Sequence, residues 1–246
     1  MDRMLYLSMN GAKQIMRAQA VNAQNLANVN TAGFREDLNA FRALPLTGPG
    51  YASRVYSEDV GNGVNLAPGP LMSTGRELDV AVRGEGYIAV QSLDGSEAYT
   101  RAGSLQVSNT GQLLTATGHP VMGTNGPIAI SPFEKLEVGT DGTISIRPIG
   151  QAAAALAVVG RIKLVKIPDQ DVMKGADGLL RNGRSTTTPA DATITLEAGY
   201  LEGSNVSAIG AMVEMISLSR QYEMQVQMMK TANETQRAGE GLMRIG

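Results

Sequence analysis

The C-terminal stretch from Ser204 to Arg244 reads SNVSAIGAMVEMISLSRQYEMQVQMMKTANETQRAGEGLMR, and it contains no proline. Its apolar residues recur three and four positions apart, which is the spacing of a helix seam and not of a strand. The seam positions are Ala208, Ala211, Met215, Leu218, Tyr222, Met229 and Ala232, with Gln225 as the one polar member. The stretch therefore predicts one long amphipathic helix whose apolar face needs a partner.

The N-terminus supplies a candidate partner helix. A seven-residue repeat is formed by Leu5, Ala12, Gln19 and Leu26, with Met9, Met16 and Ala23 in the intermediate places. This second seam is thinner, because alanine and glutamine offer little apolar area. A helix over residues 5–30 would be about 39 Å long, and one over residues 206–238 about 50 Å long. If the two helices are antiparallel and aligned at the ends nearest the middle of the chain, we expect residues 226–232 to lack cover within the chain.

The middle of the chain has a different composition. All 10 prolines lie between Pro45 and Pro189, and 21 of the 29 glycines lie between Gly61 and Gly203. Short β-like runs over 87–91, 104–108, 143–147 and 161–167 alternate with turn signals such as Asp141-Gly142. We predict an α+β fold with a discontinuous coiled-coil helical domain from residues 1–44 and 203–246. An extended linker segment is expected over 45–77, and an inserted antiparallel all-β domain over 78–202.

Composition and charge exclude several classes of protein. The net charge is -2 with both signs interspersed, which argues against a nucleic-acid partner. There is no cysteine, so neither a disulfide framework nor a cysteine metal site is expected. No window has the apolar length of a secretory signal or a membrane span, so we expect a chain that is not membrane-spanning.

The sequence contains no convincing catalytic or ligand motif. The run Gly84-Glu85-Gly86-Tyr87-Ile88-Ala89 fits a dinucleotide pattern, but strand-forming residues follow it where a phosphate site needs a helix. The single histidine, His119, is expected to be an exposed turn residue, and Glu134, Glu137 and Asp141 lack the spacing of a metal loop. We therefore predict no catalytic residues, no cofactor, no metal and no small-molecule substrate.

Two terminal motifs resemble the signatures of a known family. The first is Asn25-Leu26-Ala27-Asn28-Val29-Asn30-Thr31-Ala32-Gly33-Phe34, in which Thr31 and Gly33 can end the helix. The second is Gly203-Ser204-Asn205-Val206, followed by Met212-Val213 and Arg220-Gln221-Tyr222-Glu223. Both resemble signatures of the bacterial flagellar axial proteins, the rod, hook and hook-associated components. The resemblance implies an assembly interface at Asn25, Leu26, Asn28, Asn30, Thr31, Gly33, Phe34, Ser204, Asn205 and Val206.

The middle narrows this resemblance. Residues 78–82, 84–90 and 99–103 are similar to the core that rod and hook proteins share. The opening Met1-Asp2-Arg3-Met4-Leu5-Tyr6 and the short length are most similar to the proximal-rod members, with the distal-rod members as the nearest alternative. The alanine run at 152–155 departs from the family pattern.

The resemblance implies a structural subunit of the proximal rod, in the basal body and the periplasmic space. Its terminal helices would polymerise into the hollow drive shaft and export channel. The implied partners are copies of itself, other proximal-rod subunits, the distal-rod protein and the flagellar export apparatus. The helix seam is expected to comprise Leu5, Met9, Met16, Met215, Leu218, Tyr222, Met228, Met229 and Ala232.

Two other classes of function stay open from the residues alone. An enzyme would need a convergent pocket of titratable groups. A self-contained adhesin-like scaffold would pair its two helices only with each other.

Overall fold

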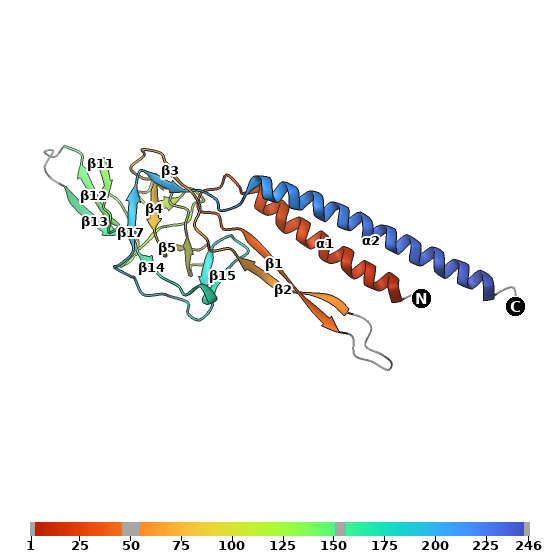
Figure 1. Cartoon of the computed structure of the whole chain (residues 1–246). Helices are drawn as coiled ribbons and strands as arrows, with labels where there is room; N and C mark the ends of the chain where they lie inside the picture. Colours follow the sequence, from red (N-terminus) through yellow and green to blue (C-terminus); the bar gives the residue numbers. More distant parts are fainter. Residues whose placement is uncertain (1–2, 46–54, 151–155, 244–246) are drawn as a thin grey trace. The chain divides into compact units, whose positions relative to one another are not determined.

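A computed structural model describes residues 3–45, 55–150 and 156–243 of the chain (Figure 1). It has two helices and many antiparallel strands, so the predicted α+β class is confirmed. The alanine run at 152–155 lies outside the described residues. The chain divides into two compact units. The helical unit comprises Met1–Val29, Glu36–Asn65 and Val206–Gly246, and the β unit comprises Asn30–Arg35 and Leu66–Asn205.

The helical unit is built on two long helices, α1 (Arg3–Ala27) and α2 (Ala208–Met243). They lie side by side and antiparallel in Figure 1. Two contacts fix their register. The Asn22 side-chain amide donates to the Ala211 carbonyl oxygen at 2.7 Å, and Gly11 leaves room for the Gln225 carboxamide, which would lie 3.1 Å from a Cβ at position 11.

The cover that α1 gives to α2 differs from the prediction. Residues 226–232 were expected to lack cover within the chain, but Ala232 is only 2% exposed. The reason is length: a partner helix of about 25 residues, laid antiparallel from the start of α2, is long enough to reach position 232. The 25 residues of α1 therefore extend along α2 as far as Ala232. The part of α2 that continues beyond this point contains no further buried position among its described side chains.

A β-hairpin completes the helical unit. Its strands are β1 (Asp37–Pro45) and β2 (Val55–Val64), with a bulge between Ala40 and Phe41. The expected linker over 45–77 is thus wrong in part, because β2 lies inside it and pairs with β1. The side-chain amides of Asn10 and Gln14 on α1 both donate to the Ser57 carbonyl oxygen, at 3.0 Å and 3.2 Å. Apolar residues of the hairpin do not alternate with polar ones over a buried face, so no strand pattern marked it in the sequence.

The β unit is formed by short strands and one 3-10 turn, η1 (Asp169–Asp171). The strands are β3 (Leu71–Ser73), β4 (Val80–Arg83), β5 (Tyr87–Gln91), β6 (Glu97–Thr100), β7 (Leu105–Val107), β8 (Leu113–Thr115), β9 (Met122–Gly123), β10 (Gly126–Pro127), β11 (Phe133–Val138), β12 (Thr143–Pro148), β13 (Ala157–Arg161), β14 (Leu164–Val165), β15 (Val172–Lys174), β16 (Leu180–Asn182), β17 (Thr195–Ala198) and β18 (Tyr200–Glu202). The expected linker range also contains β3, which pairs with β18.

The strands of the β unit pair antiparallel throughout. A five-stranded sheet has the order β14-β5-β6-β16-β15, and a three-stranded sheet has the order β11-β12-β13. The remaining strands form the two-stranded pairs β17-β4, β18-β3, β7-β8 and β10-β9. One aliphatic core joins these sheets, with Val80, Ile88, Val90, Leu105, Leu113, Val121, Ile144, Ile162 and Leu196 among its buried members.

Several local predictions are confirmed in the β unit. The run 87–91 is β5, and 143–147 lies within β12. The Asp141-Gly142 turn joins β11 to β12, with Gly142 at a φ of 83°, a region that glycine adopts at little cost. The run 161–167 is not one strand: it is divided between the end of β13 and β14, because Ile162 forms an isolated bridge with Gly123 between them.

Candidate assembly interface

Helix α2 has apolar residues on two faces. The face toward α1 carries Ala211 and Leu218, which are buried, and Met215 and Tyr222, which are half-buried. A second set, which we call the outer row, consists of Ile209, Met212, Val213 and Ile216, with exposures of 78%, 54%, 62% and 56%. Its members are three and four residues apart, so they share one side of the helix, and at 3.6 residues per turn this side points away from Leu218.

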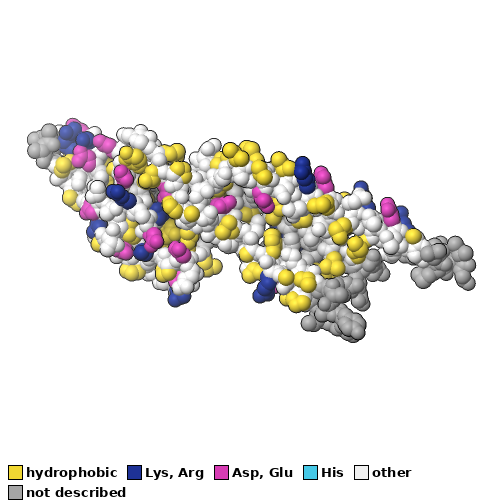
Figure 2. Space-filling view, in the orientation of Figure 1, with side chains coloured by type: hydrophobic (Ala, Val, Ile, Leu, Met, Phe, Trp, Pro, Cys, Tyr) yellow, Lys and Arg dark blue, Asp and Glu magenta, His cyan; other side chains and the backbone are white. Residues whose placement is uncertain are grey.

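Apolar side chains are exposed on the surface of the helical unit in Figure 2. Rows of this kind on a helix are rarely left in water, because burying them removes unfavourable contact with solvent. The described part of the chain does not cover the outer row. It is therefore the best candidate for a surface that another chain covers.

A groove of about 470 Å³ lies between α1 and α2. It is lined by Met9, Ala12, Lys13, Met16, Arg17, Ala20, Tyr222 and Met229. Met9 and Met16 are 54% and 56% exposed, so they lie along the groove and are not buried in the seam as expected. The buried positions of α1 are small or polar residues instead, namely Ser8, Ala12, Gln14, Ala18, Asn22 and Asn25. Small residues let two helices approach closely, which moves the longer methionines to the rim.

The other predicted seam residues are placed as follows. Leu218 and Ala232 are buried, and Leu5, Met215, Tyr222 and Met229 are half-buried. Met228 is 41% exposed.

The first terminal motif connects α1 to the hairpin and to the β unit. Asn25 is 4% exposed and pairs with the Asp37 backbone at the start of β1. The Asn28 side-chain amide donates to the Gln24 carbonyl oxygen at 2.9 Å, so it closes the last turn of α1. Leu26 is half-buried, whereas Asn30 and Thr31 are exposed. The helix ends at Ala27, three residues before the predicted end at Asn30.

Gly33 is the position in this motif that no other residue fits. Its φ is 70°, and a Cβ built on it would lie 2.2 Å from the Ala102 nitrogen. Its own N–H donates to the Glu202 carbonyl oxygen at 2.7 Å. The neighbouring Phe34 ring lies 4.0 Å from the Lys174 ammonium nitrogen, a cation–π contact. Gly33 is thus required for close approach of two backbones within the β unit. It does not end the helix, as the sequence had suggested it could, because α1 already ends at Ala27.

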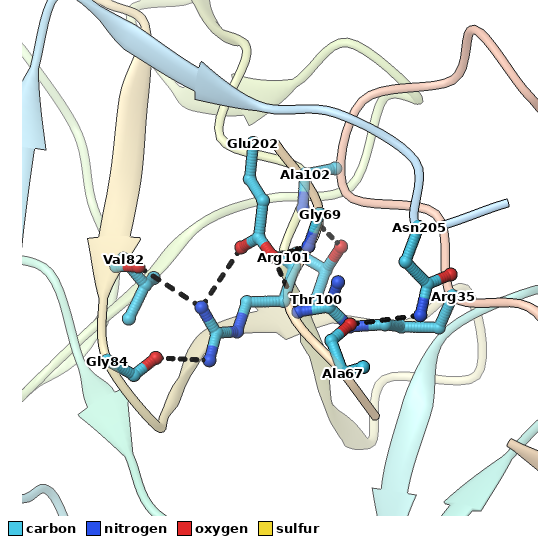
Figure 3. Close-up of polar contacts among 10 residues, drawn as sticks. All are labelled: Arg35, Ala67, Gly69, Val82, Gly84, Thr100, Arg101, Ala102, Glu202 and Asn205. Carbon is cyan, nitrogen blue, oxygen red and sulfur yellow. Dashed lines mark hydrogen bonds and ion pairs between the residues drawn. The ribbon is translucent and has the colours of Figure 1, made fainter. Parts of the chain in front are cut away.

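The second motif is equally embedded in its own chain. Ser204 is 7% exposed and Val206 is 8% exposed. The Asn205 side-chain amide donates to the Ala67 carbonyl oxygen at 2.9 Å (Figure 3). The Asn205 backbone N–H donates to the Phe34 carbonyl oxygen at 3.4 Å. The contacts that the structure gives to both motifs are therefore contacts within the chain, and their direct role in assembly stays a prediction.

A buried cluster of charges lies between the two motifs. Arg35 Nη2 donates to Glu202 Oε1 at 2.7 Å, and Arg101 Nη1 donates to Glu202 Oε2 at 3.0 Å (Figure 3). The side chains of Arg35, Arg101 and Glu202 are 2%, 6% and 2% exposed. We call these three residues the buried cluster. Removing one partner of such a pair leaves an uncompensated buried charge, which costs about 3–5 kcal/mol.

The electrostatics of the buried cluster follow from its burial. Burial lowers the pKa of the Arg101 guanidinium, and Glu202 beside it opposes that shift. Arg101 also donates to the carbonyl oxygens of Val82 and Gly84, at 3.1 Å and 2.6 Å (Figure 3). The Arg35 guanidinium is less well satisfied: among the described residues, its Nε and Nη1 atoms have no hydrogen-bond partner.

Two family models match the chain. Residues 197–242 match "Flagellar basal body rod FlgEFG protein C-terminal", and residues 81–146 match "Flagellar hook protein FlgE/F/G D1 domain". The flagellar basal-body rod protein FlgF of Escherichia coli strain K12 is 43% identical over 240 residues, which covers 95% of each chain. The chain belongs to the FlgF family of flagellar basal-body rod proteins. It is a structural subunit of the proximal rod of the flagellar basal body.

Two further relatives bear on this family assignment. The FlgF protein of Salmonella typhimurium is 42% identical over 242 residues, or 96% of each chain. The distal-rod alternative is represented by the FlgG protein of Bacillus subtilis, which is 31% identical over 258 residues, covering 95% of this chain and 96% of that one. The identity is thus higher to these two FlgF proteins than to this FlgG protein over nearly the same share of the chain.

Sequence reasoning missed the buried cluster. Arg35 directly follows the first FlgF-family motif, and Glu202 directly precedes the second. Opposite charges beside the two motifs were therefore a usable signal. The third member of the buried cluster, Arg101, lies within residues 81–146, away from both terminal motifs, so no such signal indicated it.

The residues considered for catalysis or metal binding make ordinary structural contacts. His119 was expected to be exposed, but it is buried, with 8% exposure. Its turn is folded back by the bridge between Leu114 and Pro120, and the His119 backbone N–H donates to Thr115 Oγ1 at 3.1 Å. Glu134 forms a partly exposed ion pair with Arg147. Within the described residues, no group of three His, Asp or Glu side chains could hold a metal ion. Neither helix, as far as it is described, has the length and apolar character needed to cross a membrane.

Proposed function

We propose that this proximal-rod subunit enters the rod through its helical unit. The terminal helices of neighbouring subunits would form a coiled-coil tube, which serves as the hollow drive shaft and export channel. The observation that carries this proposal is the outer row of α2, four apolar residues on the face away from α1. A self-contained scaffold would have no reason to place apolar residues on both sides of one helix, so this row favours assembly over the scaffold alternative.

In this proposal each predicted domain has its own role. Residues 1–44 with 203–246 form the assembly domain in this proposal, and residues 78–202 form an inserted antiparallel β domain on the outside of the rod. The hairpin of β1 and β2 belongs with the assembly domain, since it contacts α1 through Asn10 and Gln14.

Motif residues contribute in two ways. The buried ones, such as Asn25 and Ser204, keep the chain in the shape that assembles. Asn30 and Thr31, whose side chains are exposed, would contact neighbouring subunits. Exposed methionines at the groove and on α2, including Met9, Met16 and Met228, suit contacts with several non-identical partners because methionine adapts its shape.

The proposed partners are copies of this chain, other proximal-rod subunits and distal-rod FlgG proteins. The chain would reach the periplasmic space through the flagellar export apparatus. It would act without catalysis, cofactor, small-molecule substrate or nucleic acid. The rod proteins named above, which match along nearly the whole chain, support this placement.

A charge substitution in the outer row tests the proposal. The double variant Val213→Glu, Ile216→Glu is expressed in a strain that lacks this protein, and swimming and isolated basal bodies are compared with wild type. The matched control is Met173→Glu, which changes a 61% exposed apolar residue of the β unit. We expect the double variant to fold, to be exported and to be absent from rods, whereas the control swims normally.

Normal rods containing the double variant would overturn the proposal. Sedimentation at several protein concentrations adds an independent check in solution. Self-association of the wild type that the double variant loses supports assembly through the outer row, and a monomer at every concentration favours the self-contained scaffold.

A further inference from the structure

The segment Asn30–Arg35 is separated in sequence from the rest of the β unit to which it belongs. Its neighbours along the chain, α1 and β1, belong to the helical unit. The segment is held from two sides. Lys174 of β15 donates to the Arg35 carbonyl oxygen at 2.8 Å and lies over the Phe34 ring. The other contacts come from the end of β18 and the residues after it. Gly33 N–H donates to the Glu202 carbonyl oxygen, Arg35 donates to the Glu202 carboxylate, and Asn205 N–H donates to the Phe34 carbonyl oxygen.

We infer that Glu202 controls whether this segment is docked. Residues 30–35 close onto the β unit only when β18 is in place and its last residue presents a carboxylate to Arg35. This goes beyond the assembly role proposed above and does not depend on it, since it concerns the single chain.

Charge is the first reason. Arg35 and Arg101 are both buried, and one carboxylate lies between them. Among the described residues, the Arg35 guanidinium hydrogen-bonds only to Glu202. Docking without Glu202 would bury a second guanidinium beside Arg101 with no counter-ion, which is strongly unfavourable. In water the same guanidinium is fully solvated, so the undocked segment becomes the stable alternative.

The asymmetry between the two arginines is the second reason. Arg101 is also held by the carbonyl oxygens of Val82 and Gly84, and it lies over the Tyr87 ring at 5.4 Å. It keeps those contacts if Glu202 is lost. Arg35 does not have such substitutes for its guanidinium among the described residues. Loss of the carboxylate is therefore expected to release the segment that carries Arg35 and to leave the strand end that carries Arg101 in place.

Glu202 also joins three parts of the chain at one carboxylate. Its Oε1 accepts from Arg35 Nη2 and from the Gly69 N–H, at 2.7 Å and 2.9 Å. Its position depends on the pairing of β18 with β3, where Glu202 lies opposite Leu71. The carboxylate that Arg35 needs is therefore in position when β18 is paired with β3.

The test uses the full chain with Glu202→Gln, which keeps the shape of the side chain and removes its charge. The control is Glu85→Gln, because Glu85 is an exposed carboxylate of the same unit, paired with Lys166 at 2.8 Å. Amide hydrogen exchange is measured by NMR at Gly33 and at Ala89, whose N–H donates to the Lys163 carbonyl oxygen in the core sheet. In Glu202→Gln we expect exchange at Gly33 to rise by about tenfold or more, with Ala89 and the control variant unchanged.

A second variant separates the charge of Glu202 from its other contacts. If Arg35 stays undocked because it lacks a counter-ion, then Arg35→Met combined with Glu202→Gln docks again and slows exchange at Gly33. Equal exchange at Gly33 in wild type and Glu202→Gln would overturn the inference. So would a double variant that stays as open as Glu202→Gln, or an equal rise at Ala89, since each shows that Glu202 does not act locally through Arg35.

Discussion

The Asn25 side chain pairs with the Asp37 backbone in both directions. Its Nδ2 donates to the Asp37 carbonyl oxygen at 2.9 Å, and the Asp37 N–H donates to its Oδ1 at 2.9 Å. The asparagine therefore imitates the edge of a neighbouring strand, and it fixes where β1 begins relative to the end of α1. Only a carboxamide offers a donor and an acceptor in this arrangement.

Asn25→Asp should weaken this connection. A carboxylate accepts from the Asp37 N–H, but it cannot donate to the Asp37 carbonyl oxygen, which is left facing a negative charge. We expect the free energy of unfolding to fall by about 1–3 kcal/mol, measured by urea denaturation with circular dichroism. Asn233→Asp, at an exposed position of α2, is the control and should change stability by less than about 0.5 kcal/mol. Equal stability of the two variants would mean that the pairing contributes nothing.

Gly33→Ala and Gly84→Ala separate backbone strain from steric overlap. Both glycines have a positive φ, 70° and 78°, but only Gly33 is crowded, whereas a Cβ at Gly84 meets nothing within 4 Å. Alanine at Gly84 should cost about 1–2 kcal/mol from the left-handed conformation alone. Alanine at Gly33 should cost clearly more, because its Cβ would overlap the Ala102 backbone. Thermal unfolding of both variants provides the comparison, and similar melting temperatures would show that the Gly33 segment shifts freely.

Two truncations test where cover on α2 ends. A chain ending at Arg237 keeps Met229 and Ala232, whereas a chain ending at Val226 loses both. We expect the first to melt like wild type, as judged by the helical circular dichroism signal. The second should lose several degrees, because it removes side chains that lie against α1. A shorter chain that melts like wild type would show that the seam between the helices ends before residue 226.

The Asp177–Arg181 pair predicts a pH dependence in the acid range. The hydrogen bond from Arg181 lowers the pKa of Asp177 to about 2. A carboxyl with a lowered pKa stabilises the fold above its unfolded pKa, and that contribution is lost as the pH falls from about 4 toward 2. The pair is partly exposed, so we expect about 1–2 kcal/mol after allowing for solvent screening.

The variant Asp177→Asn provides the measurement. Its free energy of unfolding should fall less steeply than that of wild type between pH 4 and pH 2. Glu214→Gln, at an exposed position of α2, is the control and should follow the wild-type curve. Identical slopes for Asp177→Asn and wild type would contradict the lowered pKa.

Local pattern accounts for much of what could be predicted. The long helix was readable because apolar residues such as Leu218 and Tyr222 repeat at helical spacing over a stretch free of proline. Strands such as β5 and turns such as Asp141-Gly142 were readable for the same reason, since their side-chain types are demanded locally. The hairpin could not be predicted in this way, because β1 and β2 bury no alternating face. Its contacts with α1 come from residues far away in the sequence.

The sequence predicted which residues belong to the candidate assembly interface better than it predicted where each of them lies. Met9 and Met16 were assigned to the seam by spacing, yet they line the groove because alanines approach α2 more closely. The outer row was not distinguished from the seam in the sequence, because both consist of apolar residues three and four positions apart. Which face of α2 lies against α1 depends on the contacts that Asn22 and Gly11 make with it.

Sequence alone determined the α+β class, the two terminal helices and the resemblance to flagellar axial proteins, because spacing and motif are properties of neighbouring residues. Tertiary structure decided the rest. Arg35 and Glu202 are 167 positions apart, and no local sequence pattern indicates that they form an ion pair. Their partnership arises because β18 returns to the segment after α1, where a buried charge is tolerated only beside its opposite.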